Sequence, residues 1–200
     1  MRRTISLLAA LTLAAAFTPV TASSHRALGD TEVFATVGEP GMPEGIAVRD
    51  GKVYVSTHTS VRGNRGQGPS KIFVYGLASG ALLSEIVVAG QGQSVNHGVL
   101  ALTFDADGRL YAVDRNPGRV LRFDLTVDPP AQEVYATVPD LPACGLVGGP
   151  EPCSPTTIDQ ATFADYIAFD AAGNLYVTDL EAATIFRVPN EGTVPRAAEV

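Results

Sequence analysis

The apolar positions of this chain fall into short runs that are separated by turn signals. The pattern is clearest near the C-terminus, where apolar runs occupy 166–169, 175–177 and 185–186. Asp170 and Gly173 separate the first two runs. This pair is typical of a tight turn, because Gly accepts a positive φ and Asp hydrogen-bonds to its own backbone. The pattern predicts three antiparallel strands joined as a meander.

The same pattern occurs twice earlier in the chain. Three tyrosines align the copies, and each lies three residues after a glycine and three residues before a short polar residue. The tyrosines are Tyr54, Tyr111 and Tyr176, and the polar residues are Thr57, Asp114 and Asp179. The tyrosines are 57 and 65 residues apart, so the unit stays constant while its loops vary. We expect the tyrosines to pack in the core.

A fourth apolar stretch belongs to the repeat. Residues 32–37 closely match 133–138, residues 85–89 are a looser copy, and 199–200 match the start of such a stretch. Four strands in a repeat of this length favour a β-propeller blade over a β-sandwich. We therefore predict an all-β protein with four-stranded blades arranged radially.

The predicted blades cover about 44–90, 98–138 and 165–200, within a partial β-propeller at 31–200 that opens with a strand at 31–37. Because propellers close with about 4–8 blades, we expect the first three blades of a six-bladed propeller, as an incomplete arc. A complete three-repeat protein is the alternative. In an open arc we expect four apolar side chains of the first blade to be partly exposed to solvent. They are Ile46, Val48, Val53 and Val55.

The N-terminus has the pattern of a signal peptide. Arg2 and Arg3 precede an apolar run at 5–17, and small residues at 20–22 fit a cleavage site. The run is short for a bilayer span, so we expect residues 1–22 to be removed and 23–30 to form a linker. The alternative is an uncleaved anchor. The expected location is secreted or extracytoplasmic, with no membrane span after cleavage.

The charge and the cysteines fit this location. The chain has a formal net charge of −7, and without Arg2 and Arg3 it has 12 basic and 21 acidic residues, a charge of −9. This balance argues against nucleic acid or an anionic membrane as partner. Cys144 and Cys153 are the two cysteines of the chain. In an exported protein they predict a local disulfide, with a metal-binding pair as the alternative.

Candidate site residues follow from blade geometry, because the loops before the first strand and after the second strand of each blade open on one face. The candidates are Glu44, Asn96, His97 and Asp165 in the first set, and His58, Asp114 and Asp179 in the second. Their carboxylate, amide and imidazole groups are ligands for a divalent metal, Ca²⁺, Mg²⁺ or Zn²⁺. The alternatives stay open: the aspartates after the second strands can cap turns, and the histidines can be hydrogen-bonding loop residues.

On these residues the chain resembles the gluconolactonase/regucalcin-like family of NHL-repeat type β-propellers. The resemblance runs over residues 44–188 and rests on Glu44-Gly45 at the start of the first blade. It rests also on Asp165, which lies four residues before the last apolar residue of its strand, as Glu44 does. The resemblance implies a metal held by Glu44, Asp165 and an intervening Asn, for which Asn96 is the candidate, with Asp165 also as the catalytic base.

The implied function is metal-dependent hydrolysis of a lactone or ester, with a small molecule as substrate. This sequence departs from the family pattern at the third ligand, where Leu100 holds the position equivalent to Glu44 and Asp165. The alternative function is therefore a non-catalytic NHL-like propeller that binds a ligand or a protein partner.

Overall fold

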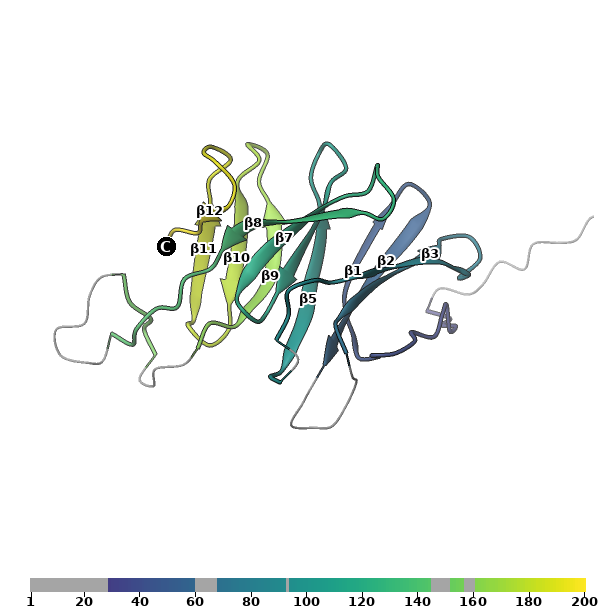
Figure 1. Cartoon of the computed structure of the whole chain (residues 1–200), viewed down its shortest axis with the longest axis horizontal. Helices are drawn as coiled ribbons and strands as arrows, with labels where there is room; N and C mark the ends of the chain where they lie inside the picture. The colour runs from purple at the N-terminus through teal and green to yellow at the C-terminus, as the bar shows by residue number, and fades with distance from the viewer. Residues whose placement is uncertain (1–28, 60–67, 93, 145–151, 157–160) are drawn as a thin grey trace, which may run out of the picture. The chain divides into compact units, whose positions relative to one another are not determined.

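The computed structural model describes residues 29–59, 68–92, 94–144, 152–156 and 161–200. The predicted signal peptide at 1–22, and all but the end of the predicted linker, lie outside the described residues. The described chain is all-β and contains twelve strands (Figure 1). No described residue belongs to a helix that could span a bilayer.

The first two blades are antiparallel four-stranded meanders, as the sequence predicts. Blade one consists of β1 (Pro43–Arg49), β2 (Lys52–Thr59), β3 (Lys71–Gly76) and β4 (Leu82–Val87). Blade two consists of β5 (His97–Phe104), β6 (Leu110–Asp114), β7 (Arg119–Asp124) and β8 (Ala131–Thr137). The end of β2 also pairs with the start of β5, where His58 lies opposite Gly98, so the two blades are joined by backbone hydrogen bonds.

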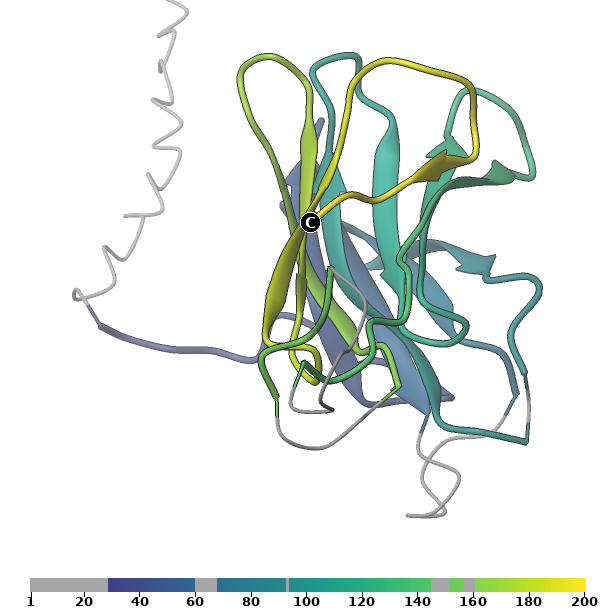
Figure 2. The same cartoon turned by 90° about the vertical axis from the view of Figure 1, so that its left-hand side faces the viewer.

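Blade three has three strands in its sheet. They are β9 (Ala164–Phe169), β10 (Leu175–Asp179) and β11 (Thr184–Val188). The last strand, β12 (Arg196–Ala197), reaches across and pairs in parallel with β8 (Figures 1 and 2). A single bridge between Arg187 and Glu199 lies at the place of the expected fourth strand. The fold-class prediction is confirmed, although the third blade is less regular than expected.

The repeat tyrosines of blades two and three each stabilise the preceding turn through a hydrogen bond. The Tyr111 hydroxyl donates to Asp105 Oδ2 at 3.1 Å, and the Tyr176 hydroxyl donates to Asp170 Oδ2 at 3.2 Å. The other carboxylate oxygen of Asp105 accepts the backbone N–H of Arg109. The constant spacing of Asp, Gly and Tyr in these two repeats is therefore explained by this hydrogen bond as well as by packing. In blade one the turn is shorter, and both Asp50 and Gly51 have positive φ, as a two-residue hairpin turn requires.

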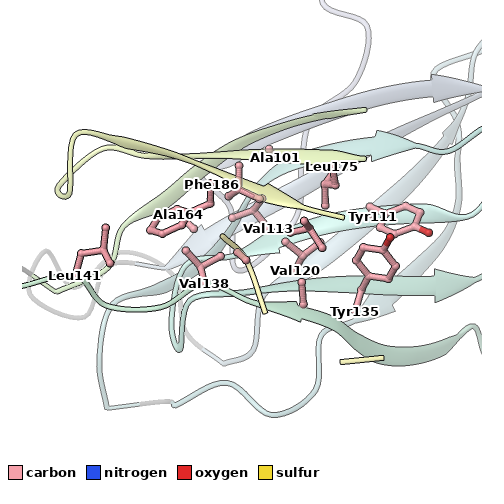
Figure 3. Close-up of a cluster of buried hydrophobic side chains, with 14 residues drawn as sticks. Ala101, Tyr111, Val113, Val120, Tyr135, Val138, Leu141, Ala164, Leu175 and Phe186 are labelled. Atoms are coloured by element: carbon pink, nitrogen blue, oxygen red, sulfur yellow. The ribbon is translucent and has the colours of Figure 1, made fainter. Parts of the chain in front are cut away.

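Apolar residues fill both interfaces between blades. Between blades one and two, the rings of Tyr54 and Phe104 meet edge to face with centroids 5.1 Å apart. Between blades two and three, Tyr111 and Phe169 meet in the same way at 4.8 Å. Figure 3 shows the buried side chains of this second interface, with Tyr111 beside Tyr135. Successive blades thus stack face to face, and blade two contributes one face to each of the two interfaces.

The segment before blade one departs from expectation. Residues 31–38 have no strand assignment, so the strand predicted at 31–37 is not formed. Instead, Ala35 and Val37 pack against the cluster that contains Val53 on the outer face of blade one. The expectation that Val53 would be partly exposed to solvent is therefore wrong, because this segment covers it. Elsewhere on the same face, Ile46 and Val48 are exposed and Val55 is half-buried, as expected.

Candidate functional site

A hollow of about 330 Å³ lies where the starts of the first strands and the ends of the second strands come together, and all three blades contribute to it. Its lining is Met42, Glu44, His58, Leu100, Arg115, Phe163, Asp165, Tyr166 and Leu180. The structure thus brings together three of the predicted site residues, Glu44, His58 and Asp165. Asn96, His97, Asp114 and Asp179 are not among the lining residues.

Six of the lining residues come from two positions of the repeat. The first position lies four residues before the last apolar residue of the first strand, and the second lies four residues after the repeat tyrosine. Glu44, Leu100 and Asp165 share the first position, and His58, Arg115 and Leu180 share the second. The repeat therefore provides the geometry of the hollow, while the differences between repeats provide its chemistry.

His58 and Arg115 form the polar centre of the hollow. Arg115 Nη1 lies 3.2 Å from His58 Nε2. A guanidinium can only donate, so Nε2 accepts this hydrogen bond and the ring proton is on Nδ1. Burial lowers the pKa of His58, and the charge of Arg115 lowers it further. The imidazole is therefore neutral at pH 7, with its lone pair directed at the guanidinium.

Arg115 is the functional candidate that the sequence reasoning missed. Its guanidinium carbon lies 3.9 Å from the centroid of the Phe163 ring, within the range of a cation–π contact. Burial lowers the pKa of Arg115, while the nearby carboxylates of Glu181 and Asp165 oppose this shift. Its position four residues after Tyr111, equivalent to that of His58 after Tyr54, is the signal that could have identified it.

Asp165 lies close enough to Arg115 for their charges to interact. Burial raises the pKa of Asp165, the positive charge of Arg115 opposes the rise, and Asp179 adds to it. The hollow thus combines a guanidinium, a neutral imidazole and a carboxylate whose charged form is partly disfavoured. Such perturbed groups in a concave site are typical of functional sites.

Two glycines allow blades one and two to approach closely enough to form the hollow. A Cβ on Gly98 would lie 2.8 Å from Cγ of His58, so a larger residue would displace the imidazole. A Cβ on Gly45 would lie 2.8 Å from Cα of Ala101 in blade two. Gly45 also donates its N–H to the buried hydroxyl of Ser56, which donates in turn to the Val99 carbonyl. The glycine after Glu44 is therefore required by close packing at the interface between blades one and two.

Asp114 is a buried structural acid. Its carboxylate accepts hydrogen bonds from Arg119 Nε at 2.9 Å and from Gln91 Nε2 at 2.8 Å. Burial raises the pKa of Asp114, against the opposing effects of these two partners. Both carboxylate oxygens are engaged, so they are not available to a ligand in the hollow.

Asp179 and His97 are likewise engaged by the protein itself. The Asp179 oxygens accept the backbone N–H groups of Ala182 at 2.8 Å and Phe163 at 2.9 Å. His97 is buried, and its ring nitrogens lie 2.8 Å from the Val95 carbonyl and 3.0 Å from the Gly68 carbonyl. These contacts agree with the capping and hydrogen-bonding alternatives for Asp179 and His97.

The residues around the hollow do not fit the expected metal site. Glu44 and Asp165 line it, but the equivalent third position holds Leu100, which has no ligand atom. Arg115 adds a positive charge beside Asp165 that would repel a cation. Within the part of the chain that the structure describes, no group of three or more His, Cys, Asp or Glu residues could hold a metal ion. A bound metal stays a prediction of the sequence.

The predicted disulfide is present. Cys144 and Cys153 are bonded, with their Cα atoms 5.1 Å apart. Nearby, the Ser154 hydroxyl donates to the Ala182 carbonyl in the turn after β10. The cross-linked loop is thereby attached to blade three close to the Asp179 turn.

Comparison with known proteins gives fold neighbours only. No protein-family model matches the chain, and a search of curated proteins finds no match. Among solved structures, selenomethionine-substituted virginiamycin B lyase from Staphylococcus aureus is 17% identical over 81% of this chain and 42% of its own, with a TM-score of 0.48. A catalytically inactive virginiamycin B lyase with quinupristin is 19% identical over 80% and 41%, with a TM-score of 0.47. The chain thus spans about two fifths of these proteins, and the likeness assigns it no family.

Proposed function

We propose that the hollow binds a small organic molecule that has an apolar body and a carboxylate or carbonyl oxygen. The observation that carries this proposal is Arg115, a guanidinium stacked on Phe163 and hydrogen-bonded to a neutral imidazole. Unlike Arg119, which is paired with Asp114 at 2.8 Å, Arg115 has no ion pair within 4 Å among the described residues. An anionic or carbonyl oxygen of a ligand would supply a strong acceptor for its N–H groups.

The rest of the lining suits such a ligand. Small-molecule sites are concave, mostly apolar and have few polar groups, and their volumes are about 300–1,000 Å³. Here Met42, Leu100, Phe163 and Leu180 supply apolar surface in a hollow of about 330 Å³. Glu44 and Asp165 add acceptors that can orient hydroxyl groups of a ligand. The hollow therefore fits a ligand with an apolar part and one acidic or carbonyl end.

A binding experiment tests this proposal. A panel of small carboxylates and lactones, such as benzoate and δ-valerolactone, is titrated against the protein and followed by NMR or calorimetry. Arg115→Gln is expected to weaken carboxylate binding about tenfold or more, because a hydrogen bond to a charged group contributes about 1.5–3 kcal/mol. Arg109→Gln is the control, because Arg109 lies outside this hollow. Equal affinity of the protein and its Arg115→Gln variant would reject the proposal.

Hydrolysis of a lactone or ester is the second candidate, and the neutral state of His58 is the observation that favours it. A ligand carbonyl that takes the Nη1 donor of Arg115 would leave His58 Nε2 free to accept a proton from water. The water oxygen would then add to the carbonyl carbon, and the imidazolium would return the proton to the departing alkoxide. Asp165 is the alternative base implied by the family resemblance.

The test of hydrolysis separates these bases from a metal. Turnover of δ-valerolactone and p-nitrophenyl acetate is measured with and without a chelator, for the protein and for its His58→Gln and Asp165→Asn variants. Loss of turnover in His58→Gln with no effect of chelator supports the imidazole route. Chelator-sensitive turnover would instead support the metal-dependent reaction that the family resemblance implies. No turnover under any condition leaves binding as the function.

We further propose that the protein works outside the cytoplasm. The Cys144–Cys153 disulfide supports this proposal, because disulfides persist mainly in oxidising compartments. The basic and apolar pattern of residues 1–22 supports it as well. Deleting residues 1–22 is expected to retain the protein in the cytoplasm, which fractionation can measure.

A further inference from the structure

A second cavity, which we call the turn-side pocket, lies between blades two and three and has a volume of about 350 Å³. It is lined by the turns that contain Asp105 and Asp170, each of which joins the first strand of its blade to the second. The loop after β11, which contains Asn190, also lines it. The hollow around Arg115 lies at the starts of the first strands and the ends of the second strands. The turn-side pocket is therefore at the opposite end of the blades.

A difference between the two blade interfaces explains why there is space for this pocket. Arg49 and Asp105 hold the same position of the repeat, directly after the last apolar residue of the first strand. Between blades one and two, the Arg49 guanidinium carbon lies 5.5 Å from the centroid of the Phe104 ring, and Nη1 donates to the Asp105 carbonyl at 3.0 Å. Between blades two and three, the Asp105 side chain instead bonds back to its own turn, at the Arg109 N–H and the Tyr111 hydroxyl. The space that Arg49 fills at the first interface is thus left open at the second.

Aromatic rings form one wall of the turn-side pocket and are held in place by their neighbours. The rings of Tyr111 and Tyr135 meet edge to face with centroids 4.8 Å apart (Figure 3), and Tyr111 and Phe169 meet in the same way at 4.8 Å. The guanidinium carbons of Arg122 and Arg196 lie 5.3 Å and 4.6 Å from the Tyr135 centroid. Because these contacts order the side chains before a ligand binds, less conformational entropy is lost on binding.

The charged groups of the turn-side pocket are balanced. Its lining includes three arginines and three aspartates, whose charges sum to zero: Arg109, Arg122, Arg196, Asp105, Asp107 and Asp170. A guanidinium can only donate hydrogen bonds, and an ionised carboxylate can only accept them. An anionic ligand would be repelled by the aspartates, and a cationic ligand would be repelled by the arginines. A hydroxyl group both donates and accepts, so an uncharged ligand with several hydroxyls suits both kinds of group.

Two side chains of the turn-side pocket retain hydrogen-bonding capacity for such a ligand. Arg196 Nε and Nη2 donate to backbone carbonyls of the loop after β11 at 3.1 Å and 3.5 Å, which leaves Nη1 available among the described residues. Asn190 Nδ2 donates to the Ala172 carbonyl at 2.9 Å, and this contact fixes the amide with its own carbonyl oxygen still able to accept. A Cβ on Gly173 would lie 2.6 Å from Asn190 Nδ2, so the turn admits this amide because it has a glycine there.

We propose that the turn-side pocket binds an uncharged polyhydroxylated molecule, such as a monosaccharide. Arg196 Nη1 would donate to one hydroxyl oxygen, and Asn190 Oδ1 would accept the proton of a neighbouring hydroxyl. The half-buried ring of Phe169 would contact the C–H groups of the ligand. The volume lies within the range of about 300–1,000 Å³ that is usual for small-molecule sites. This site is separate from the hollow around Arg115 and does not rest on the function proposed for it.

A titration followed by NMR tests the ligand class and the location of the site together. The ¹⁵N-labelled protein is titrated separately with D-glucose, D-galactose, D-mannose, myo-inositol and inorganic phosphate. At least one of the four polyols is expected to shift the backbone amide signals of Ala171, Gly173 and Asn190, which line or form the pocket. The signals of Phe163 and Leu180, which line the other hollow, are expected to stay unchanged.

Substitutions measure the contribution of the two proposed contacts. Asn190→Ala and Arg196→Gln are each expected to weaken polyol binding about two- to tenfold, as the loss of one hydrogen bond does. Lys52→Gln is the control, because it removes a positive charge from an exposed residue outside the pocket. Thermal unfolding checks that each variant is folded.

Three results would overturn the proposal. The first is that none of the four polyols shifts the amide signals of the turn-side pocket, or that they shift those of Phe163 and Leu180 instead. The second is that inorganic phosphate shifts the pocket signals more strongly than the polyols do, which would identify an anion site. The third is that Asn190→Ala and Arg196→Gln bind polyol with the same affinity as the Lys52→Gln control.

Discussion

Two groups of acids lie near the ends of the blade strands, and their surroundings differ. Asp114 and Asp179 end the second strands of blades two and three, and both are buried with their oxygens hydrogen-bonded to the protein. Glu44 and Asp165 begin the first strands of blades one and three and line the hollow. Arg115 directly follows Asp114, and Leu180 directly follows Asp179. Both of these following residues also line the hollow.

The difference shows how the repeat separates structure from function within a few residues. At the ends of the second strands, the acid is buried and its carboxylate is hydrogen-bonded to the protein. The residue after the acid lines the hollow. At the starts of the first strands, the acid itself lines the hollow. Substitutions at the first group should therefore reduce stability, and substitutions at the second group should change binding.

The largest stability effect is expected at Asp114. Asp114→Ala removes the carboxylate that holds Arg119 and leaves a guanidinium that is 13% exposed without its partner. Breaking a buried ion pair in this way costs about 3–5 kcal/mol, which chemical denaturation can measure. The double variant Asp114→Ala/Arg119→Met should recover part of the loss. A loss below about 1 kcal/mol for the single variant would show that Asp114 is not the structural acid of this comparison.

The next effect is expected at Gly45, where the hollow depends on close contact between blades. In Gly45→Ala the new methyl group would meet the Ala101 backbone at 2.8 Å, so the blades must move apart. Overpacking of this kind costs about 1–3 kcal/mol, and the movement should also weaken ligand binding near Glu44. Gly38→Ala is the control, because its methyl group would come no closer than 3.7 Å to Phe73. Similar losses in both variants would argue against a tight interface at Gly45.

The strands could be predicted from the sequence because their signals are local. The apolar runs at 166–169, 175–177 and 185–186 correspond to β9, β10 and β11, with bounds that differ by at most two residues. The strand predicted at 31–37 failed for a non-local reason. Its pattern matches β8, but a strand needs a neighbouring edge, and this segment packs on the side chains of blade one instead.

The site was predictable only in part. The alignment on tyrosines placed Glu44, His58 and Asp165 at the ends of strands, and the structure brings them into one hollow. The burial of His97 could not be inferred, because it depends on pairing between β2 and β5 of different blades. Arg115 was not predicted, although it follows Tyr111 by four residues, as His58 follows Tyr54.

A smaller stability effect distinguishes the two aspartates of blade three. In Asp179→Asn, one of the two backbone N–H groups held by the carboxylate faces an amide NH₂ instead, and this costs about 1–2 kcal/mol. Asp165→Asn is the matched substitution in the hollow, and it should change stability by less than about 0.5 kcal/mol, as expected away from structural hydrogen bonds. Thermal and urea unfolding measure both. The reverse order would mean that the structural and functional acids are exchanged.

The smallest effect concerns the pH dependence that His58 adds to folding. An unfolded chain protonates its histidines near pH 6.5, whereas burial and Arg115 hold the pKa of folded His58 lower. Well above pH 6.5 the imidazole is neutral in both states and does not change the free energy of unfolding. As the pH falls below 6.5, the unfolded state binds the proton first, so the free energy of unfolding decreases until the lower folded pKa is reached. Urea unfolding between pH 7.5 and 5.5 should show this decrease, and His58→Asn should reduce it. An unchanged pH slope in the variant would show that the neutral imidazole beside Arg115 is not a property of the folded protein.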